Sequence, residues 1–414
     1  QQLVDKYLLK NRSTGEVYET PQFAYILISM IVFSNYPKDK RLDYIKKAYN
    51  YISQFKISLP TPIMAGVRTP IRQYSSCVLV DIGDDLKSIF SSTTAIGYYT
   101  ARRAGMGINA GRIRPIGSSI RNGEVIHTGI IPFLKVVEST AKSCSQNGIR
   151  GGGGTVHVPF WHYEIEDVIV LKNNAGTDDN RVRKLDYSIQ FSKIFYQRLI
   201  KNEKITLFSP WECKGLYESM GTDKFDELYL KYEQDSTLLF KKEIPARQLA
   251  ELFSKERLET GRIYLMNIDN ANQGPWLDTV YMSNLCQEVT QPTVPINHID
   301  DKDGEIGVCT LSAINVVETK LEEFPQVIDI SVRILDEIID QQDYPVKAAE
   351  NFTVNRRSLG IGITNFAAYL AMKKVKYEDA AAIELMDELA ENLQYYALLA
   401  STNLAKEKGA CAKF

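Results

Sequence analysis

The chain has 414 residues, of which 44% are hydrophobic and 24% are charged. This composition is that of an ordinary globular protein and excludes the disordered, collagen-like and low-complexity classes. The 49 Lys and Arg residues nearly balance the 51 Asp and Glu residues, so no surface built to hold nucleic acid is predicted. The longest apolar stretch, residues 23–33, is shorter than the roughly 20 residues that cross a bilayer. We therefore expect a cytoplasmic protein without a membrane or nucleic-acid partner.

The first 56 residues are predicted to be helical. Thr20 and Pro21 form an N-cap and first-turn pair, and the apolar residues after them recur with the period of one buried helix face. The predicted buried face consists of Phe23, Ile26, Leu27, Met30 and Ile31. A second helix is expected over residues 39–55, with Leu42 and Ile45 among its inward residues. We therefore predict a helical domain over residues 1–71.

From about residue 72 the pattern changes to short apolar runs that alternate with helical stretches. The apolar runs lie at residues 77–80, 165–171, 186–191, 205–208, 263–267 and 307–316. This alternation is typical of βαβ units in a parallel sheet or barrel. The chain closes on a long helix over residues 378–408 that stops at Gly409, with no strand after it. The prediction for residues 72–414 is an α/β fold with an incomplete barrel.

Metal and dinucleotide sites are not predicted. The spacing of the four histidines forms no metal signature and no Cys-x-x-Cys pair is present. The glycine-rich segment 105–111 is similar to a dinucleotide fingerprint, but it follows a predicted helix where the fingerprint follows a strand. We interpret these glycines as sites of close backbone packing.

Residues 283–289 form the segment with the most chemical information. If the segment is extended, Asn284, Cys286 and Glu288 share one face because side chains alternate with period two. An amide, a thiol and a carboxylate together can orient a substrate hydroxyl, form a sulfur radical and accept a proton. From the spacing alone, an edge strand with polar side chains in solvent and a chance cysteine is the simpler interpretation.

Further segments make the interpretation specific. They are Leu59-Pro60-Thr61-Pro62-Ile63-Met64, Tyr74-Ser75-Ser76-Cys77-Val78-Leu79, Ala110-Gly111-Arg112-Ile113-Arg114, Val308-Cys309-Thr310-Leu311-Ser312 and Arg356-Arg357-Ser358-Leu359-Gly360-Ile361-Gly362. In this order, and with Asn284-Leu285-Cys286-Gln287-Glu288, the sequence resembles the large, catalytic subunit of class I ribonucleotide reductase over essentially its whole length. The resemblance implies a ten-stranded α/β barrel with a finger loop around residues 284–290.

The resemblance also implies catalytic roles. Cys286 would become the thiyl radical that takes the 3′ hydrogen, Glu288 would accept the 3′-hydroxyl proton, and Asn284 would hydrogen-bond the ribose hydroxyls. Cys77 and Cys309 would reduce the 2′ carbon and be left as a disulfide. Two thiols can supply the two electrons and protons that loss of the 2′-hydroxyl as water requires.

Binding sites are implied in the same way. The substrate would be held by Thr61, Ser76 and Gly105, together with Asn284 and Glu288. The allosteric specificity site, which binds a deoxynucleoside triphosphate or ATP at a dimer interface, would consist of Asp84, Asp85, Leu86, Arg114 and Arg121. Asp84 is expected to open a helix there. The loop that relays the identity of the effector would include Cys144, Gln146, Arg150 and Gly151.

The implied protein is a ribonucleoside-diphosphate reductase that acts as a homodimer on ribonucleoside diphosphates. It would bind no cofactor or metal in this chain, receive its radical from a small diiron-type subunit, and be reduced by a thioredoxin- or glutaredoxin-type protein. The remaining barrel strands, the C-terminal tail and an N-terminal activity module have no counterpart here. We therefore expect an excerpt, or one half of a split subunit that a second chain completes. Two alternatives stay open: an adenosylcobalamin-dependent relative, and a non-catalytic module for nucleotide sensing and dimerisation.

Overall fold

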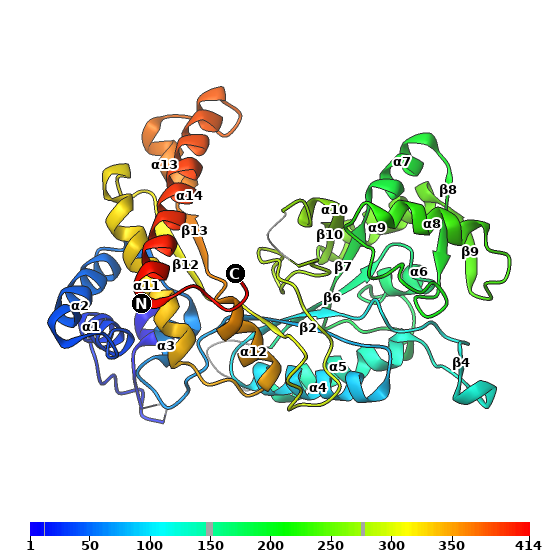
Figure 1. Ribbon diagram of the computed structural model, residues 1–414, viewed down its shortest axis with the longest axis horizontal. Helices are drawn as coiled ribbons and strands as arrows, with labels where there is room; N and C mark the ends of the chain where they lie inside the picture. The colour runs from blue at the N-terminus through cyan, green and yellow to red at the C-terminus, as the bar shows by residue number, and fades with distance from the viewer. Residues whose placement is uncertain (12, 146–151, 275–277) are drawn as a thin grey trace. The chain divides into compact units, whose positions relative to one another are not determined.

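The computed structural model describes residues 1–11, 13–145, 152–274 and 278–414. The chain forms two compact units (Figure 1). The helical unit consists of Gln1–Ser76, Cys309–Tyr344 and Phe352–Phe414, and the sheet unit of Cys77–Val308 and Pro345–Asn351. Within the described part of the chain, no helix is both long and apolar enough to span a membrane. The predicted domain boundary after residue 71 stays a prediction.

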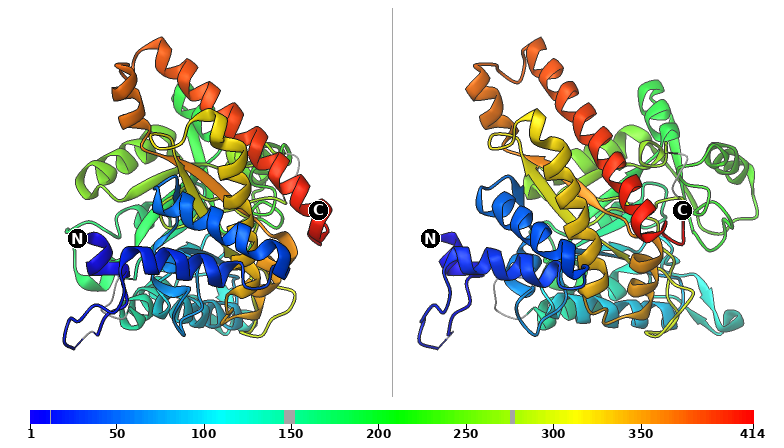
Figure 2. Two further views of the ribbon diagram at one scale, coloured as in Figure 1. Left: turned by 90° about the vertical axis from the view of Figure 1, so that its left-hand side faces the viewer. Right: turned by 60° about the vertical axis from the view of Figure 1, so that its left-hand side comes forward.

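The helical unit is built around helix α11 (Phe324–Gln341). Its other helices are η1 (Leu3–Tyr7), α1 (Pro21–Val32), α2 (Lys38–Ser53), α3 (Thr61–Gly66), η4 (Leu321–Glu323), α13 (Phe366–Lys373) and α14 (Ala380–Lys408). Helix α11 packs against α1, α2 and α14, and Figure 2 shows α14 running alongside α11. Its buried residues include Val327, Ile328 and Leu335. The apolar side chains of α11 therefore form the centre of this unit's core.

A small sheet completes the helical unit. Its three strands are β1 (Ile57–Ser58), β12 (Leu311–Asn315) and β13 (Gly360–Thr364). Strand β12 lies in the middle, antiparallel to β1 and parallel to β13. Helix α12 (Lys347–Arg356) contributes residues to both units.

The sheet unit contains a six-stranded sheet in the order β10-β7-β6-β3-β2-β11. These strands are β2 (Cys77–Asp81), β3 (Gly105–Asn109), β6 (Gly154–Pro159), β7 (Asp186–Phe191), β10 (Ile263–Asn267) and β11 (Gly307–Val308). All neighbours are parallel except β11, which is antiparallel to β2. The sheet ends at β10 and β11 and is not closed, which agrees with the predicted α/β fold and incomplete barrel.

Helices connect these strands as expected for parallel pairs. They are α4 (Leu86–Ala101), α5 (Ile130–Cys144), α6 (Ile165–Ile169), α7 (Lys193–Lys201), α8 (Lys224–Gln234) and α9 (Ala246–Thr260), and the short helix α10 (Ile268–Ala271) follows β10. The smaller elements are β4 (Ser119–Ile120), η2 (Arg121–Gly123), β5 (Val125–Ile126), η3 (Asp178–Asn180), β8 (Lys204–Phe208) and β9 (Lys241–Pro245). The predicted runs at residues 186–191 and 263–267 coincide with β7 and β10.

Three predictions of local structure were wrong. Leu42 of α2 does not face inward as predicted, because it is 59% exposed, whereas Ile45 is buried. Residues 165–171 do not form a strand, because Ile165–Ile169 are helix α6. Helix α1 begins at Pro21 after its Thr20 cap as predicted, but it buries the face of Ala24 and Ser29 and leaves Phe23 62% exposed. This helix carries apolar residues on nearly all of its faces, so the spacing of its apolar residues does not identify which face is buried. Ser29 tolerates burial because its hydroxyl donates to the Tyr25 carbonyl at 2.9 Å.

A buried ion pair holds the N-terminal segment of the helical unit. The side chains of Arg68 and Glu19 are only 3% and 6% exposed. Arg68 Nε donates to both carboxylate oxygens of Glu19 at 2.9 Å, and its Nη2 donates to the Tyr7 carbonyl at 2.8 Å. Because both charges are buried, removing one leaves the other without an opposite charge.

We expect Arg68→Met to lower the free energy of unfolding by about 3 kcal/mol, because it leaves the Glu19 carboxylate buried and unpaired. Chemical denaturation measures this change. The control is Lys47→Met, which breaks the exposed pair with Asp43 and should cost less than about 1 kcal/mol. Equal losses in the two variants would contradict the assigned importance of the buried pair.

Candidate active site

Cys77 is the first residue of β2 and is 2% exposed. It pairs in parallel register with Gly105, the first residue of β3. The next residue, Val78, pairs in antiparallel register with Val308 of β11. Two predicted site residues, Cys77 and Gly105, are therefore ladder partners at the same end of the sheet.

The segment that carries Asn284, Cys286 and Glu288 is a hairpin and not an extended strand. A bridge between Ser283 and Thr290 closes its base. The Gln287 backbone N–H donates to the Asn284 carbonyl at 3.3 Å, which makes a turn at the tip. The predicted alternation therefore fails: Asn284 is fully buried, while Cys286 and Glu288 are exposed.

The turn nevertheless brings predicted catalytic residues together. The Asn284 side chain donates from Nδ2 to the Cys77 sulfur at 3.1 Å. The Cys77 thiol donates to Glu288 Oε1 at 4.0 Å. Asn284 is itself oriented, because its Oδ1 accepts from the Val289 backbone N–H at 3.0 Å. An amide and a carboxylate of the hairpin thus converge on a buried thiol of the sheet.

The other predicted substrate and redox residues lie in the helical unit. Cys309 is 1% exposed, and its sulfur lies 3.4 Å from the Ser76 hydroxyl. Thr61 is the first residue of α3, and its hydroxyl lies 3.2 Å from the Tyr7 hydroxyl. Ser76 and Cys309 are therefore placed together.

Polar residues of the sheet, which were not predicted, hold the hairpin. Thr155 of β6 donates from its hydroxyl to the Leu285 carbonyl at 2.8 Å. Gln190 of β7 donates from Nε2 to the Tyr281 carbonyl. The signal was present in the sequence, because polar residues alternate with apolar ones in both strands. The buried polar members of this face are Thr155, His157, Ser188 and Gln190.

Close packing at Gly107 of β3 also seats the hairpin. A Cβ atom at this position would lie 2.2 Å from the Ser283 carbonyl oxygen and 2.9 Å from the Asn284 Cα. Both are backbone atoms, so no side chain can be accommodated without displacing the hairpin. The glycine-rich segment 105–111 is therefore a strand with a close-packing glycine.

The predicted effector residues line one cavity of about 650 Å³ in the sheet unit. Its wall includes all five of them, namely Asp84, Asp85, Leu86, Arg114 and Arg121. Its other side chains include Trp211, His127 and Phe133, none of which was predicted. The cavity lies where α4 begins and where the β4–β5 hairpin turns back.

Arg114 is held on two sides within this cavity. Its Nε donates to Asp84 Oδ2 at 2.7 Å, and its guanidinium carbon lies 3.8 Å from the centre of the Trp211 ring. Asp84 does not open the helix as predicted. The N-cap of α4 is Asp85, whose side chain accepts from the Ser88 backbone N–H at 3.0 Å.

Glu164 binds both ends of the segment between Ile116 and Ile130, which forms part of the cavity wall. Its Oε2 accepts from the Ile116 N–H at 3.0 Å and from the Ile130 N–H, at the start of α5, at 3.2 Å. Burial raises the pKa of Glu164 to about 7, although the two N–H donors act to lower it. A Cβ on Gly129 would lie 2.5 Å from Glu164 Oε1, so this glycine gives the carboxylate its space.

The predicted relay loop is described only at its start. Cys144 is the last residue of α5, and a Cβ on Gly97 of α4 would lie 3.3 Å from its sulfur. Gln146, Arg150 and Gly151 lie outside the described residues.

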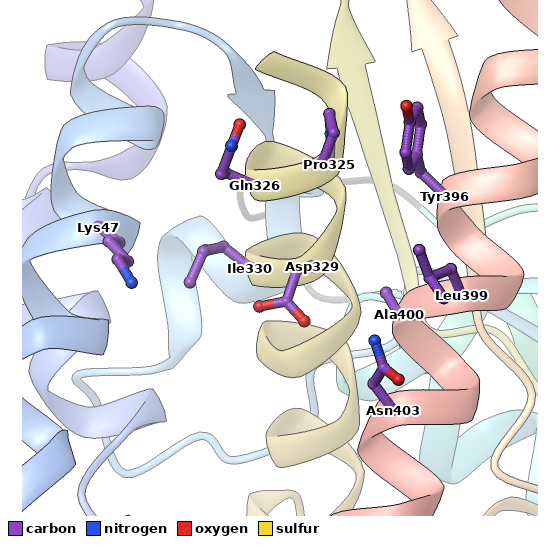
Figure 3. Close-up of a pocket in the computed structure, with 9 residues that line it drawn as sticks. All are labelled: Lys47, Pro325, Gln326, Asp329, Ile330, Tyr396, Leu399, Ala400 and Asn403. Carbon is purple, nitrogen blue, oxygen red and sulfur yellow. The ribbon is translucent and has the colours of Figure 1, made fainter. Parts of the chain in front are cut away.

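A cavity in the helical unit contains none of the predicted site residues. It measures about 290 Å³ and lies among α2, α11 and α14 (Figure 3). Its charged residues already have partners, because Lys47 pairs with Asp43 and Asp329 with Arg333. Among the residues that the structure describes, no group of three or more His, Cys, Asp and Glu side chains is placed to hold a metal ion.

Two family models match this chain. Residues 1–72 match the all-alpha domain of ribonucleotide reductase, and residues 75–414 match its barrel domain. The chain belongs to the ribonucleotide reductase family. These matches agree with the resemblance seen in the sequence and with the hairpin seated on a parallel sheet.

Curated relatives of the family align with the whole chain. It is 52% identical to the ribonucleoside-diphosphate reductase subunit alpha of Buchnera aphidicola subsp. Acyrthosiphon pisum, and 53% identical to that of Haemophilus influenzae. It is 50% identical to the ribonucleoside-diphosphate reductase 1 subunit alpha of Escherichia coli. Each alignment covers 100% of this chain and 55–56% of the relative. The chain thus spans about half the length of these relatives.

We expect Gly107→Ala to displace the hairpin, because the added methyl group meets backbone atoms of Ser283 and Asn284. Amide hydrogen exchange over residues 281–290 should become at least about tenfold faster. The control is Gly153→Ala, whose Cβ would make only ordinary contacts of 3.8 Å with Leu285. Unchanged exchange in Gly107→Ala would contradict the close packing described here.

We expect Glu164 to make the fold less stable as the pH rises. Its pKa is about 7 in the folded protein and near 4.3 in an unfolded chain, so the folded state binds more protons between these values. The free energy of unfolding should therefore fall as the pH rises from about 4 to 7, by at most about 3 kcal/mol. Glu164→Gln keeps an oxygen acceptor for both N–H groups and should remove this part of the pH dependence. Denaturation at a series of pH values would test this, and an unchanged profile in the variant would contradict it.

Proposed function

We propose that this chain is the catalytic part of a ribonucleoside-diphosphate reductase, which converts ribonucleotides to deoxyribonucleotides by radical chemistry. The observation that carries the proposal is the convergence of Asn284 and Glu288 on Cys77. Membership of the family gives this arrangement its chemical meaning, and the relatives are named for this activity. Because the chain spans about half of those relatives, the activity is proposed for the assembled enzyme.

In this proposal Cys286, exposed at the tip of the hairpin, takes the 3′ hydrogen atom of the substrate as a thiyl radical. Glu288 accepts the 3′-hydroxyl proton, and Asn284 positions the ribose. The 2′-hydroxyl then leaves as water with one proton from the thiols of Cys77 and Cys309. The same thiols supply two electrons and the second proton, which form the 2′ C–H bond, and they become a disulfide. Glu288 returns its proton to the 3′ oxygen, and Cys286 returns the hydrogen atom to the 3′ carbon and is again a thiyl radical.

Several features support the pairing of Cys77 with Cys309. In the chain, Cys77 precedes Val78 and Cys309 follows Val308, and these two valines are antiparallel ladder partners. Burial of both cysteines protects a thiol pair from unrelated oxidants.

Thr61, Ser76 and Gly105 are proposed to bind the substrate, because hydroxyl and backbone N–H groups are suitable donors to a ribose and a diphosphate.

The cavity that contains Asp84, Arg114 and Arg121 is proposed as the effector site. Its two guanidinium groups suit the phosphates of a deoxynucleoside triphosphate or ATP, and its volume of about 650 Å³ is within the range of nucleotide-sized pockets.

We propose that the enzyme is a homodimer of large subunits that receives its radical from a small diiron-type subunit. A thioredoxin- or glutaredoxin-type protein would reduce the disulfide, and a further chain or segment would supply the C-terminal half.

We expect Cys286→Ser to abolish deoxynucleotide formation in the assembled enzyme, because a hydroxyl hydrogen is bound too strongly to be exchanged with the ribose. Product is measured with the small subunit and a dithiol reductant present. The matched control, Cys411→Ser, changes a cysteine outside the site and should keep full activity. Retained turnover in Cys286→Ser would remove this residue from the mechanism.

The effector cavity also fits the alternative of a non-catalytic nucleotide-sensing module. Calorimetric titration with dTTP combined with a product assay separates the two functions. The reductase should bind dTTP in both the unchanged protein and Cys286→Ser but form product only in the former. A protein that binds dTTP and makes no deoxynucleotide with either the small subunit or adenosylcobalamin would favour the sensing module.

A further inference from the structure

Gln287 occupies an unusual position between Cys286 and Glu288. Its φ angle is +71°, in the left-handed region that non-glycine residues rarely adopt because it strains the backbone. Its side chain is partly buried, although those of its two neighbours are exposed. The Gln287 backbone is strained, and its side chain turns inward while those of Cys286 and Glu288 turn outward. Such a conformation persists only if contacts of the Gln287 side chain stabilise it.

The amide of Gln287 makes three polar contacts. Its Oε1 accepts from the Ser188 hydroxyl at 3.1 Å, and its Nε2 donates to the Asn284 carbonyl at 3.1 Å. The same Nε2 lies 3.4 Å from His157 Nε2. The opposite amide orientation would place Oε1 against the Asn284 carbonyl oxygen, so these contacts define which end is the donor.

His157 is suited to accept the second amide hydrogen. Burial lowers its pKa to about 3, with a smaller opposing contribution from the Ser283 backbone. The imidazole is therefore neutral at physiological pH and can present an unprotonated Nε2 to Gln287. His157 is in β6 and Ser188 is in β7, and the two are ladder partners. The contacts of Gln287 thus reach two adjacent strands at one level of the sheet.

These contacts fix the tip on one side, and Thr155 fixes the other side through the Leu285 carbonyl. Cys286 lies between the two anchored residues. The residue is exposed, but contacts to the sheet hold the backbone carbonyl before it and the side chain after it. An exposed reactive group with an anchored backbone can meet a substrate without losing its position.

We propose that Gln287 is a positioning residue, whose amide locks the hairpin tip to β6 and β7 and so fixes Cys286 and Glu288 for reaction. The inference rests on the proposed function for its catalytic consequence. The anchoring itself is independent of that function, because it is a property of contacts within the sheet unit.

The test uses Gln287→Leu, which keeps the size of the side chain and removes its polar contacts. Amide exchange at residues 285–288 should become about tenfold faster. In the assembled reductase, kcat per dTTP-binding site should fall about 10- to 100-fold, while the affinity for dTTP changes less than about twofold. Counting dTTP sites separates lost positioning from lost folding, because a merely structural role would reduce the number of sites and not the rate per site.

A double variant identifies the contact responsible. Gln287→Leu with His157→Phe replaces both polar partners by apolar groups of similar shape, which restores packing between the tip and β6. Because the contacts to Ser188 and Asn284 stay lost, we expect partial recovery: the losses of kcat and of slow amide exchange should be smaller than the product of the losses in the two single variants. The matched control, Gln248→Leu, removes a glutamine contact on exposed α9 that reaches Glu166 and should change neither quantity.

Three results would overturn the inference: unchanged amide exchange in Gln287→Leu, unchanged kcat per site, or losses in the double variant equal to the product of the single losses. Failure of the proposed function would be recognised separately, by turnover in Cys286→Ser. In that case faster amide exchange in Gln287→Leu would still support the anchor and contradict only its catalytic consequence.

Discussion

The arrangement of the candidate site depends on the seating of one hairpin against the polar face of a parallel sheet. Gly107 lets the hairpin backbone approach β3, and Thr155 and Gln190 bind its carbonyl groups from β6 and β7. Buried backbone groups must be paired, and here the sheet's side chains pair them. The chemistry proposed for Asn284 and Glu288 depends on this packing, because both side chains contact Cys77 only while the hairpin is bound to the sheet.

The same constraint explains the composition of the strands. Strands buried on both faces in α/β proteins are usually continuous apolar runs, yet β6 and β7 carry Thr155, His157, Ser188 and Gln190 in their interiors. Such residues cost stability unless they are hydrogen-bonded. Their bonds to the hairpin offset that cost for Thr155 and Ser188 and give the sheet a surface that recognises one backbone conformation.

The sequence allowed part of this to be predicted. Several strands were predicted correctly, since buried apolar runs are local signals. The roles of Cys77, Asn284 and Glu288 were inferred from ordered sequence motifs and stay predictions. The buried face of α1 was assigned wrongly, because an almost uniformly apolar helix has no preferred side until its neighbours are known. The expectation that Asn284, Cys286 and Glu288 share one face failed because Gln287 adopts a positive φ, which no alternation rule detects. Trp211 was missed because its stacking on Arg114 joins residues far apart in the chain.

Glu164 has a consequence for how the cavity around Arg114 can vary among related proteins. One carboxylate oxygen accepts the N–H groups of both Ile116 and Ile130, so the two ends of the intervening loop meet at a single atom. The hydrogen bonds to this atom therefore close the loop between Ile116 and Ile130 at its base. Insertions or deletions within residues 117–128 can therefore reshape the lip of the cavity while β3 and α5 keep their places. Differences in what this cavity binds can therefore arise in this loop without any change to the sheet that carries Cys77.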